Sequence, residues 1–414
     1  MSAVRELERL LVGGCRICFG ELGLVLSLGQ HPVPNRLPKA ADEPVARYPL
    51  DLKRCQGCGL FQLGHVLPAD ELFGDYAYET PESPSLTAHY ERVYEMVADV
   101  VAHVLTHRPG LVVEVGSNNG AFLGPLPWWG KKIGVDPSAA AERAEERGIE
   151  TRKAYFSRAE AAAIRKDHGP AMLVVMRHCL AHVDDIHELM AGAALLLDTR
   201  GALYVENAYV YSTLLGGQYD QIYHEHMSYL AVGPMKELAE SHSLEIVRVA
   251  EAPVHGGSMG FFLAHKGQRG VGPSVAEAIR REVDLDQAGV VGSFASGAKA
   301  AIEELGAMVR SLSEQGKVVD CYGASAKGVT VLNAAGLTRK EIRQCLDGSA
   351  RKHGRYVPGT GIPIVPKGTH RTPWQPDYCI VTAWNYLDEI RRDEAEYEAR
   401  GGKWIVPVPA PRVL

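Results

Sequence analysis

The sequence lacks long apolar runs, an excess of positive charge and a dense set of cysteines. No uninterrupted apolar stretch approaches the roughly 20 residues of a membrane-spanning helix, so we expect no membrane partner. Lys and Arg number 44 against 50 Asp and Glu, and a net charge of -6 argues against a nucleic-acid binder, which needs a basic stripe. Acidic residues precede the first short apolar run, unlike in a secretory signal, so a cytoplasmic location is expected.

The eight cysteines are too sparse for a disulfide scaffold in 414 residues, but four of them form two close pairs. Cys15 and Cys18 make one Cys-x-x-Cys motif, and Cys55 and Cys58 make a second one after 36 intervening residues. Four thiolates from two tight turns suit tetrahedral zinc, and a site closed by four cysteines is structural rather than catalytic. Four free or buried thiols remain the alternative.

The length and composition predict an ordinary globular protein of two or three domains. The chain is 46% hydrophobic and 23% charged, which is typical of a globular protein. The net charge of -6 favours a small-molecule partner. Residues 1–80 are rich in Gly, Pro and Cys and predict a small zinc-binding module. We place a central α/β domain at residues 81–310 and a second α/β domain at residues 311–414.

The central segment alternates strand-like and helix-like patterns. Apolar runs at 111–115, 172–176 and 202–205 predict strands, and helical spacing appears from about 138 and over 186–197. Strands separated by helices predict a parallel, doubly wound sheet. A helical stretch near 274–313 leads to the last unit, which begins with strand 317–322 and includes strand 378–382.

A glycine-containing turn, Glu-Val-Gly-Ser-Asn-Asn-Gly, follows the first central strand and opens a helix. Such a turn lets a ligand approach backbone N–H groups, and Asp136 at the end of the next strand can accept hydrogen bonds from a ribose diol. The motif looks like the S-adenosylmethionine signature of class I methyltransferases; NAD and a plain strand–turn–helix are the alternatives. We predict that the methyl donor, S-adenosylmethionine, is bound by this turn, called the donor loop below, and by Asp136. The predicted residues are Glu114, Gly116, Asn118, Asn119, Gly120 and Asp136.

The segment from Tyr219 to Tyr229 concentrates groups that can move protons. It contains His224, Glu225 and His226 next to Tyr223. A neutral histidine can act as a general base near pH 7, and a tyrosine can stabilise a developing enolate oxygen. A polar network that braces a loop is one alternative. Metal binding by His224 and His226 is another, because an i, i+2 pair on a strand shares one face.

A second glycine-rich turn opens the last unit, in Tyr322-Gly-Ala-Ser-Ala-Lys327-Gly. Lys327 at this helix start can bind an anion, and Lys352 and Arg355 add positive charge. Solvated Lys and Arg side chains are the ordinary alternative. Together these residues predict an anionic ligand held by the last domain.

The order of the motifs resembles that of the sugar C-methyltransferases that act on nucleotide-linked keto-deoxysugars in antibiotic pathways. The likeness spans nearly the whole chain, from the paired Cys-x-x-Cys motifs through Leu-Ala-His-Val and Tyr-His-Glu-His to Ala-Trp-Asn-Tyr. It implies a class I (Rossmann-like) methyltransferase core, an N-terminal zinc-binding module and a C-terminal Rossmann-like domain that helps to hold a nucleotide sugar, with dTDP as a candidate nucleotide. The substrate-binding residues expected here are His224, Tyr322, Lys327, Lys352 and Arg355.

The resemblance also assigns roles in catalysis. The histidine that closes Tyr-His-Glu-His, His226, matches the family's base, with Tyr223 and Glu225 beside it. A ketone at C4 of the sugar acidifies the neighbouring C3–H, so loss of that proton gives an enolate that attacks the methyl group of the donor. Zinc does no chemistry in this scheme, because four cysteines fill its coordination sphere.

Three further residues are expected near the sugar. Tyr76 or Tyr78 matches a tyrosine segment that covers the substrate in the family, and His182 is expected beside the methyl-transfer centre. The chain departs from the family after Tyr78 and in Met-Arg-His-Cys before His182, so the reaction class is better determined than the sugar. O- or N-methylation of another metabolite and an inactive zinc-containing binding protein are the alternatives.

Overall fold

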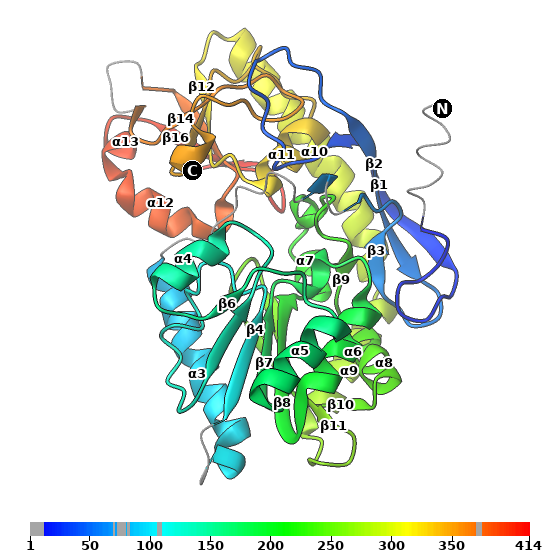
Figure 1. Cartoon of the computed structure of the whole chain (residues 1–414). Coiled ribbons are helices and arrows are strands. Elements are labelled where there is room, and N and C mark those ends of the chain that lie inside the picture. The colour runs from blue at the N-terminus through cyan, green and yellow to red at the C-terminus, as the bar shows by residue number, and fades with distance from the viewer. Residues whose placement is uncertain (1–11, 69–70, 73–79, 81–82, 106–109, 370–374) are drawn as a thin grey trace, which may run out of the picture.

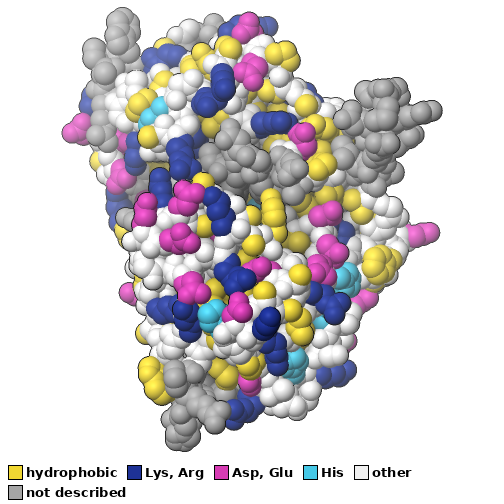
Figure 2. All heavy atoms as spheres, in the orientation of Figure 1, with side chains coloured by type: hydrophobic (Ala, Val, Ile, Leu, Met, Phe, Trp, Pro, Cys, Tyr) yellow, Lys and Arg dark blue, Asp and Glu magenta, His cyan; other side chains and the backbone are white. Residues whose placement is uncertain are grey.

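The computed structural model describes residues 12–68, 71–72, 80, 83–105, 110–369 and 375–414. The segment that contains Tyr76 and Tyr78 lies outside the described residues. Three β-sheets organise the described chain (Figure 1). Among the described helices, none is long and apolar enough to cross a membrane. The face drawn in Figure 2 intermixes Lys and Arg side chains with Asp and Glu.

The first sheet has four strands in the order β1-β2-β3-β9. The strands β1 (Leu22–Pro32), β2 (Arg47–Cys55) and β3 (Phe61–Leu63) come from the cysteine-rich segment and pair antiparallel. The fourth strand, β9 (Ser228–Tyr229), comes from the middle of the chain and pairs antiparallel with β3. The N-terminal module therefore shares its sheet with the segment that directly follows His226.

The second sheet has seven strands in the order β10-β11-β8-β7-β4-β5-β6. The five strands from β8 to β6 run parallel, as predicted. The last two strands, β11 and β10, are antiparallel to their neighbours, which the pattern of alternating helices and strands did not predict. The strands are β4 (Leu111–Val115), β5 (Lys132–Val135), β6 (Thr151–Arg152), β7 (Ala171–Arg177), β8 (Leu197–Ala208), β10 (Leu244–Ala252) and β11 (Ser258–His265).

Helices cover both faces of this sheet (Figure 1). Val112 of β4 packs in a core with α3, whereas its neighbour Val113 packs in a core with α5 and α6. Successive side chains of a strand point to opposite faces, so a strand between two helix layers is buried on both sides and mostly apolar. All five residues of β4 are buried, and Glu114 is the one polar residue among them. The helices are α3 (Pro84–Leu105), α4 (Ala140–Glu146), α5 (Arg158–His168) and α6 (Ile186–Leu196).

The third sheet has six strands in the order β14-β13-β12-β15-β16-β17, and all but β17 are parallel. The predicted strands near 317–322 and 378–382 correspond to β12 and β15. The elements are β12 (Val319–Tyr322), α11 (Ala326–Ala334), β13 (Cys345–Asp347), β14 (Ile364–Pro366), β15 (Tyr378–Val381), α12 (Leu387–Asp393), α13 (Ala395–Ala399), β16 (Lys403–Val406) and β17 (Arg412–Val413).

Helical segments connect the second and third sheets. The predicted helix near 274–313 is two helices, because Gly289 adopts a left-handed conformation (φ 74) between them. The boundaries at residues 80 and 310 stay a prediction. The remaining elements are η1 (Leu180–His182), α7 (Val210–Leu215), η2 (Tyr219–Gln221), α8 (Val232–Ser241), α9 (Pro273–Gln287), α10 (Val290–Glu314), η3 (Ala350–Lys352) and η5 (Trp384–Tyr386).

Candidate active site

One cavity of about 600 Å³ joins residues from all three parts of the chain. Gly116 and Asp136 line it from the carboxyl ends of β4 and β5, where ligands bind in open α/β sheets. Asn35 reaches it from the N-terminal segment, and Lys327 and Lys352 reach it from the last one. The same cavity is thus lined by residues of the predicted donor loop, by residues of the proton-transfer cluster and by the two lysines predicted to bind an anion.

The donor loop needs its glycines. Gly116 (φ 71) and Gly120 (φ 73) both adopt left-handed conformations. A Cβ on Gly120 would lie 2.4 Å from Cδ1 of Ile149, and a Cβ on Gly116 would lie 2.9 Å from Cβ of Cys179. These close contacts explain why the strand-to-helix turn uses glycine at both positions.

Asp136 closes the donor loop from the neighbouring strand. Its Oδ2 accepts a hydrogen bond from the backbone N–H of Asn118 at 2.8 Å, and its Oδ1 accepts one from the backbone N–H of Ser138 at 2.9 Å. Asn118 and Asn119 are in turn hydrogen-bonded to the backbone of Thr80. The carboxylate lines the cavity where a ribose diol of a donor would be held.

Glu114 is buried at the base of the same loop. Burial raises the pKa of its carboxyl group to about 8, and Nη1 of Arg177 lies 3.9 Å from Oε1. The guanidinium of Arg177 lies 4.2 Å from the ring centroids of both Tyr90 and Phe122. Among the described residues Oε2 of Glu114 has no hydrogen-bond partner, and Glu114 is one of the residues that line the cavity. The loop therefore fits S-adenosylmethionine.

The hydrogen bonds of His226 define its tautomer. Nδ1 lies 3.0 Å from the carbonyl oxygen of Gln221, which can only accept, so Nδ1 carries the proton. Nε2 then accepts a hydrogen bond from the hydroxyl of Tyr223, which lies 2.5 Å away. Burial, with a smaller contribution from His182, lowers the pKa of His226 well below its usual range. The imidazole is thus neutral, with its lone pair on the Tyr223 side.

Two further predicted catalytic residues, His182 and Glu225, face the same cavity. The ring of His182 lies edge-on to His226, with centroids 5.0 Å apart, and burial lowers its pKa to about 4. Glu225 is buried, and both of its oxygens accept from Nδ2 of Asn35, at 2.8 and 2.9 Å. Burial raises the pKa of Glu225 to about 7.

The structure separates His224 from this cluster. Residues 224 and 225 form a turn rather than a strand, so the i, i+2 histidines do not share a face. His224 is buried against Tyr48, with ring centroids 6.0 Å apart and edge-on geometry, and is not among the cavity residues. This geometry does not support the alternative of a metal site at His224 and His226, and His224, predicted to bind substrate, lies outside the cavity lining.

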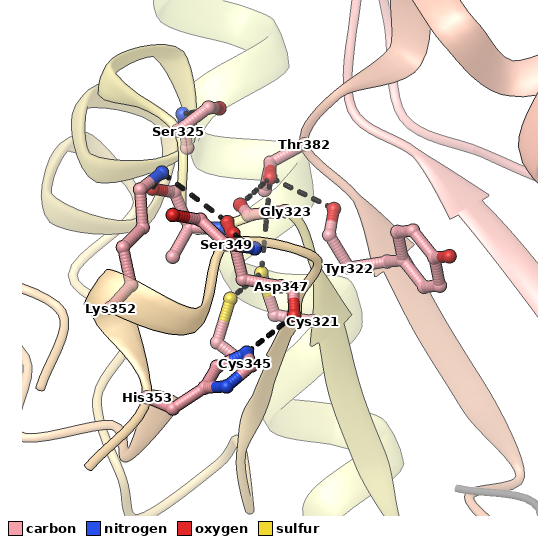
Figure 3. Close-up of polar contacts among 12 residues, drawn as sticks. Cys321, Tyr322, Gly323, Ser325, Cys345, Asp347, Ser349, Lys352, His353 and Thr382 are labelled. Atoms are coloured by element: carbon pink, nitrogen blue, oxygen red, sulfur yellow. Dashed lines mark hydrogen bonds and ion pairs between the residues drawn. The ribbon is translucent and has the colours of Figure 1, made fainter. Parts of the chain in front are cut away.

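The last domain brings two of its four predicted residues to the cavity. Nζ of Lys327 donates to the carbonyl oxygen of His255 at 3.4 Å and lies 5.1 Å above the ring of Trp384. Nζ of Lys352 donates to the carbonyl oxygen of Ala324 at 2.7 Å and lies 3.3 Å from Oδ2 of Asp347 (Figure 3). Both ammonium groups sit beside the N-terminus of α11, where backbone N–H groups also favour an anion.

The other two predicted residues of the last domain lie outside the cavity lining. Tyr322 points away from α11 (Figure 3), and its hydroxyl donates to Oε1 of Glu394 at 3.2 Å beside Trp404. Arg355 is half-buried, and its backbone pairs with Ile364 and Lys352. Residues 325–327 and Lys352 line the cavity, whereas the strand and turn geometry directs the side chains of Tyr322 and Arg355 elsewhere.

The sequence reasoning missed a buried carboxylate network beside the donor loop. Oε1 of Glu206 accepts from Nε2 of His178 at 3.0 Å, while Oε2 lies 2.8 Å from Nε2 of His89 and accepts the hydroxyl of Tyr204 at 2.6 Å. Hydrogen bonds from the histidines keep the pKa of Glu206 well below its usual range despite complete burial. His178 lines the cavity and lies edge-on to His255, with centroids 4.5 Å apart. Only the position of His178 directly after a parallel strand hinted at this role.

The four predicted zinc ligands converge. Their sulfur atoms all lie within 4.8 Å of one another, with Cys15 to Cys58 and Cys18 to Cys55 each at 3.4 Å. Within the part of the chain that the structure describes, no other group of three or more Cys, His, Asp or Glu side chains has this arrangement. Four thiolates fit a closed zinc site that stabilises the module and leaves no position for a substrate.

Comparisons with known proteins agree with this geometry. Three family models match in order: "Putative zinc binding domain" at residues 15–73, "Methyltransferase domain" at residues 88–249 and "C-methyltransferase C-terminal domain" at residues 253–409. The class that the fold and the site define is therefore that of the S-adenosylmethionine-dependent methyltransferases with an N-terminal zinc-binding module.

A full-length relative narrows the class. C-methyltransferase NovU of Streptomyces niveus is 38% identical over 408 residues, which cover 97% of this chain and 96% of the relative. The chain belongs to this C-methyltransferase family, and the expected family membership is confirmed.

Solved structures include two that each cover less than half of this chain. Magnesium protoporphyrin IX methyltransferase (ChlM) from Synechocystis PCC 6803 is 15% identical, with 46% of this chain and 88% of that chain covered and a TM-score of 0.34. N-methyltransferase NodS from Bradyrhizobium japonicum WM9 is 13% identical, with 44% and 98% covered and a TM-score of 0.33.

Proposed function

We propose that this C-methyltransferase adds a methyl group to the carbon next to the ketone, C3, of a nucleotide-linked 4-keto-deoxysugar through an enolate. The observation that carries the proposal is the single cavity shared by the donor loop, the His182 and His226 pair, and the lysines of the last domain. Methylation of a carbon next to a ketone requires a base and a group that stabilises the developing oxyanion. Binding of a nucleoside diphosphate requires cations, and the cavity contains groups of both kinds.

The donor end of the cavity is set by Asp136 and the loop at residues 116–120. When bound, S-adenosylmethionine supplies an electrophilic methyl group on a sulfonium. Asp136 would hold the ribose, and the glycines let the backbone approach the donor closely. His178 and Cys179 follow β7 directly beside the loop and would line the side of the methyl group.

His226 and Tyr223 would divide the acceptor chemistry between them. Nε2 of His226 is unprotonated and accepts the C3 proton, and the electron pair of the broken C–H bond becomes the enolate. The hydroxyl of Tyr223, 2.5 Å from that nitrogen, turns to donate to the enolate oxygen at C4. C3 then forms the new C–C bond with the methyl carbon, while the electrons of the broken S–C bond stay on sulfur.

The nucleotide end would lie against the last domain. Lys327, Lys352 and the N-terminus of α11 present positive charge and N–H groups to the cavity. Tyr322, Arg355 and His224 were predicted to bind substrate but lie outside the cavity lining, so we assign them no contact with the nucleotide. Tyr76 and Tyr78 stay candidate cover residues.

Deuterium exchange tests the proposal directly. We would incubate the chain in deuterated water with S-adenosylhomocysteine and a dTDP-linked 4-keto-6-deoxysugar, and follow the C3–H signal by proton NMR. The wild type should exchange this proton, and His226→Asn should not, while both bind S-adenosylhomocysteine with similar affinity in calorimetry. With S-adenosylmethionine, mass spectrometry should show one added methyl group on carbon.

Other results would overturn parts of the proposal. Exchange at full rate in His226→Asn would remove His226 as the base. Methylation on oxygen or nitrogen without C–H exchange would contradict the enolate route. Tight binding of S-adenosylhomocysteine with no response to any dTDP-linked keto sugar or to dTDP alone would contradict the nucleotide-sugar acceptor.

A further inference from the structure

Arg16 links the zinc site to the catalytic cavity. It lies inside the first Cys-x-x-Cys turn, between Cys15 and Ile17, and only 5% of its side chain is exposed. Its backbone N–H donates to Oε1 of Gln62 in β3 at 2.9 Å, which fixes the turn to the sheet. The side chain then leaves the zinc module and enters the methyltransferase core.

One guanidinium nitrogen of Arg16 contacts the residues that follow both cavity histidines. Nη2 donates to the carbonyl oxygen of Val183, which follows His182, at 2.6 Å. The same nitrogen lies 3.8 Å from Sδ of Met227, which follows His226. It also donates to the carbonyl oxygen of Asp184 and lies 3.3 Å from Oδ1 of that residue.

Backbone hydrogen bonds join these two segments to each other and to the module. The N–H of Met227 donates to the carbonyl oxygen of Ala181 at 2.7 Å, so the residues beside the two histidines are directly paired. The N–H of Leu63 in β3 donates to the carbonyl oxygen of Met227 at 3.0 Å. The rings of His182 and His226 are therefore held 5.0 Å apart by a frame that has Arg16 at its centre.

We infer that Arg16 is a positioning residue that transmits the shape of the zinc-bound turn to the His182 and His226 pair. It touches neither substrate nor methyl donor in this role and acts only through its contacts with Val183, Asp184 and Met227. Zinc then matters to catalysis because Cys15 and Cys18 fix the turn from which Arg16 projects. The part of this inference that concerns turnover rests on the proposed function.

The chain offers a matched control in Arg54. This residue belongs to the same module and pairs with Asp286 of α9, so it also joins the module to the core, but its partner lies outside the cavity lining. If the module only needs to stay docked, removing either arginine should have the same effect. If Arg16 positions the histidines, only its removal should affect them.

The test compares Arg16→Met, Arg16→Lys and Arg54→Met in the full zinc-loaded chain. Hydrogen–deuterium exchange read by mass spectrometry needs no acceptor: Arg16→Met should raise exchange in peptides that cover 178–186 and 226–230 at least about tenfold, with no change at the donor loop. Arg54→Met should leave these peptides unchanged, and Arg16→Lys, which can still donate to one carbonyl, should fall between.

Turnover of a dTDP-linked 4-keto-6-deoxysugar gives the second readout. Because a misplacement of about 1 Å can cost about a hundredfold in rate, Arg16→Met should lower kcat by that order while the Kd for S-adenosylhomocysteine stays within a factor of about three. Arg16→Lys should recover part of kcat. Zinc content, measured by elemental analysis, should remain one ion per chain in all three variants.

Three outcomes would overturn the inference. These are unchanged exchange in Arg16→Met, equal effects of Arg16→Met and Arg54→Met, and loss of donor affinity in parallel with kcat. If Arg16→Met loses zinc, Arg16→Lys with full zinc decides, since wild-type exchange in both peptides would then rule out the positioning role. If the wild type methylates no keto sugar, the proposed function fails while the exchange comparison still decides the role of Arg16.

Discussion

Burial neutralises the two central titratable groups of the cavity in opposite ways. It raises the pKa of Glu225 to about 7, which favours the protonated acid, and lowers the pKa of His226, which favours the free base. Neither group then brings a full charge to the acceptor carbon below neutral pH. In the proposed enolate route, the charge that matters is the one that would develop on the enolate oxygen, beside Tyr223.

Replacement of Glu225 by Gln should change the pH dependence of stability. A glutamate has a pKa of about 4.3 in the unfolded chain, whereas that of Glu225 is about 7 in the folded one. Between these values the unfolded chain releases a proton that the folded chain keeps, so the free energy of unfolding of the wild type falls as pH rises, by roughly 2 to 4 kcal/mol. Glu225→Gln lacks this loss, and Gln can still accept from Asn35.

Thermal unfolding at pH 5, 6, 7 and 8 measures the difference. The Tm of Glu225→Gln should rise relative to the wild type with increasing pH and level off above pH 7. A difference in Tm that does not vary with pH would contradict the raised pKa of Glu225.

Gly116→Ala should weaken binding of the methyl donor more than it destabilises the fold. The added Cβ would lie 2.9 Å from Cβ of Cys179, and alanine at a φ of 71 is strained by about 1 kcal/mol or more. Both effects distort the loop that is predicted to hold the methyl donor. Calorimetry with S-adenosylhomocysteine should show a loss of affinity of at least about tenfold, which corresponds to about 1.4 kcal/mol. Gly148→Ala, also at positive φ but with nothing within 4 Å of the added Cβ, is the control and should bind normally.

At the scale of single elements, the two glycine turns of the chain are built alike. In each, an acid at the end of the neighbouring strand accepts one backbone N–H from the turn and one from the residue two positions after itself. For Asp136 the donors are Asn118 and Ser138, at 2.8 and 2.9 Å; Asp347 makes the equivalent bonds at 2.9 and 2.8 Å. The same local solution thus shapes both ends of the cavity.

The cap of α11 should affect both stability and nucleotide binding. Oγ of Ser325 accepts from the backbone N–H of Gly328 at 3.1 Å, and Ser325 lines the cavity. Ser157 caps α5 in the same way, with Oγ accepting from Glu160, but lies outside the cavity lining. Each serine-to-alanine change should cost about 1 kcal/mol in chemical denaturation. Only Ser325→Ala should also weaken binding of dTDP in calorimetry; equal nucleotide affinity in both variants would contradict a nucleotide site at α11.

The elements that the sequence predicted are those with local signals. The donor loop, its flanking strands and the paired cysteines each depend on spacing within a few residues, and the structure has them where the pattern placed them. The alternative of a metal pair at His224 and His226 assumed a strand where the chain forms a turn, because the tyrosines and histidines of residues 219–229 give no clear period. The Glu206 network and the pairing of β3 with β9 join residues far apart in sequence, and no local pattern can predict such contacts.

At the scale of the whole molecule, the N-terminal module supports one side of the candidate active-site cavity. Asn35 holds Glu225, Arg16 holds the residues beside His182 and His226, and β3 pairs with β9. A module that was only attached in sequence would not make these contacts.

Loss of zinc should therefore impair more than the module. Cys55→Ser should abolish stoichiometric zinc binding, because one of four ligands is replaced, and should lower Tm by several degrees. Cys379→Ala, a change at a buried cysteine of β15 outside the zinc cluster, is the control for thiol removal. Elemental analysis should give one zinc per chain in the wild type and in the control. Retention of a full zinc equivalent by Cys55→Ser would contradict the four-cysteine site.

The pairing of β3 with β9 also constrains how the chain can be assembled during synthesis. A ribosome completes residues 22–63 long before it reaches residues 228–229, so the nascent N-terminal sheet has an open edge at Phe61 and Leu63, two side chains that are fully buried in the finished protein. An open apolar edge invites pairing with other chains. The N-terminal segment is therefore expected to depend on the rest of its own chain, or on a chaperone, until the last strand of its sheet has been made.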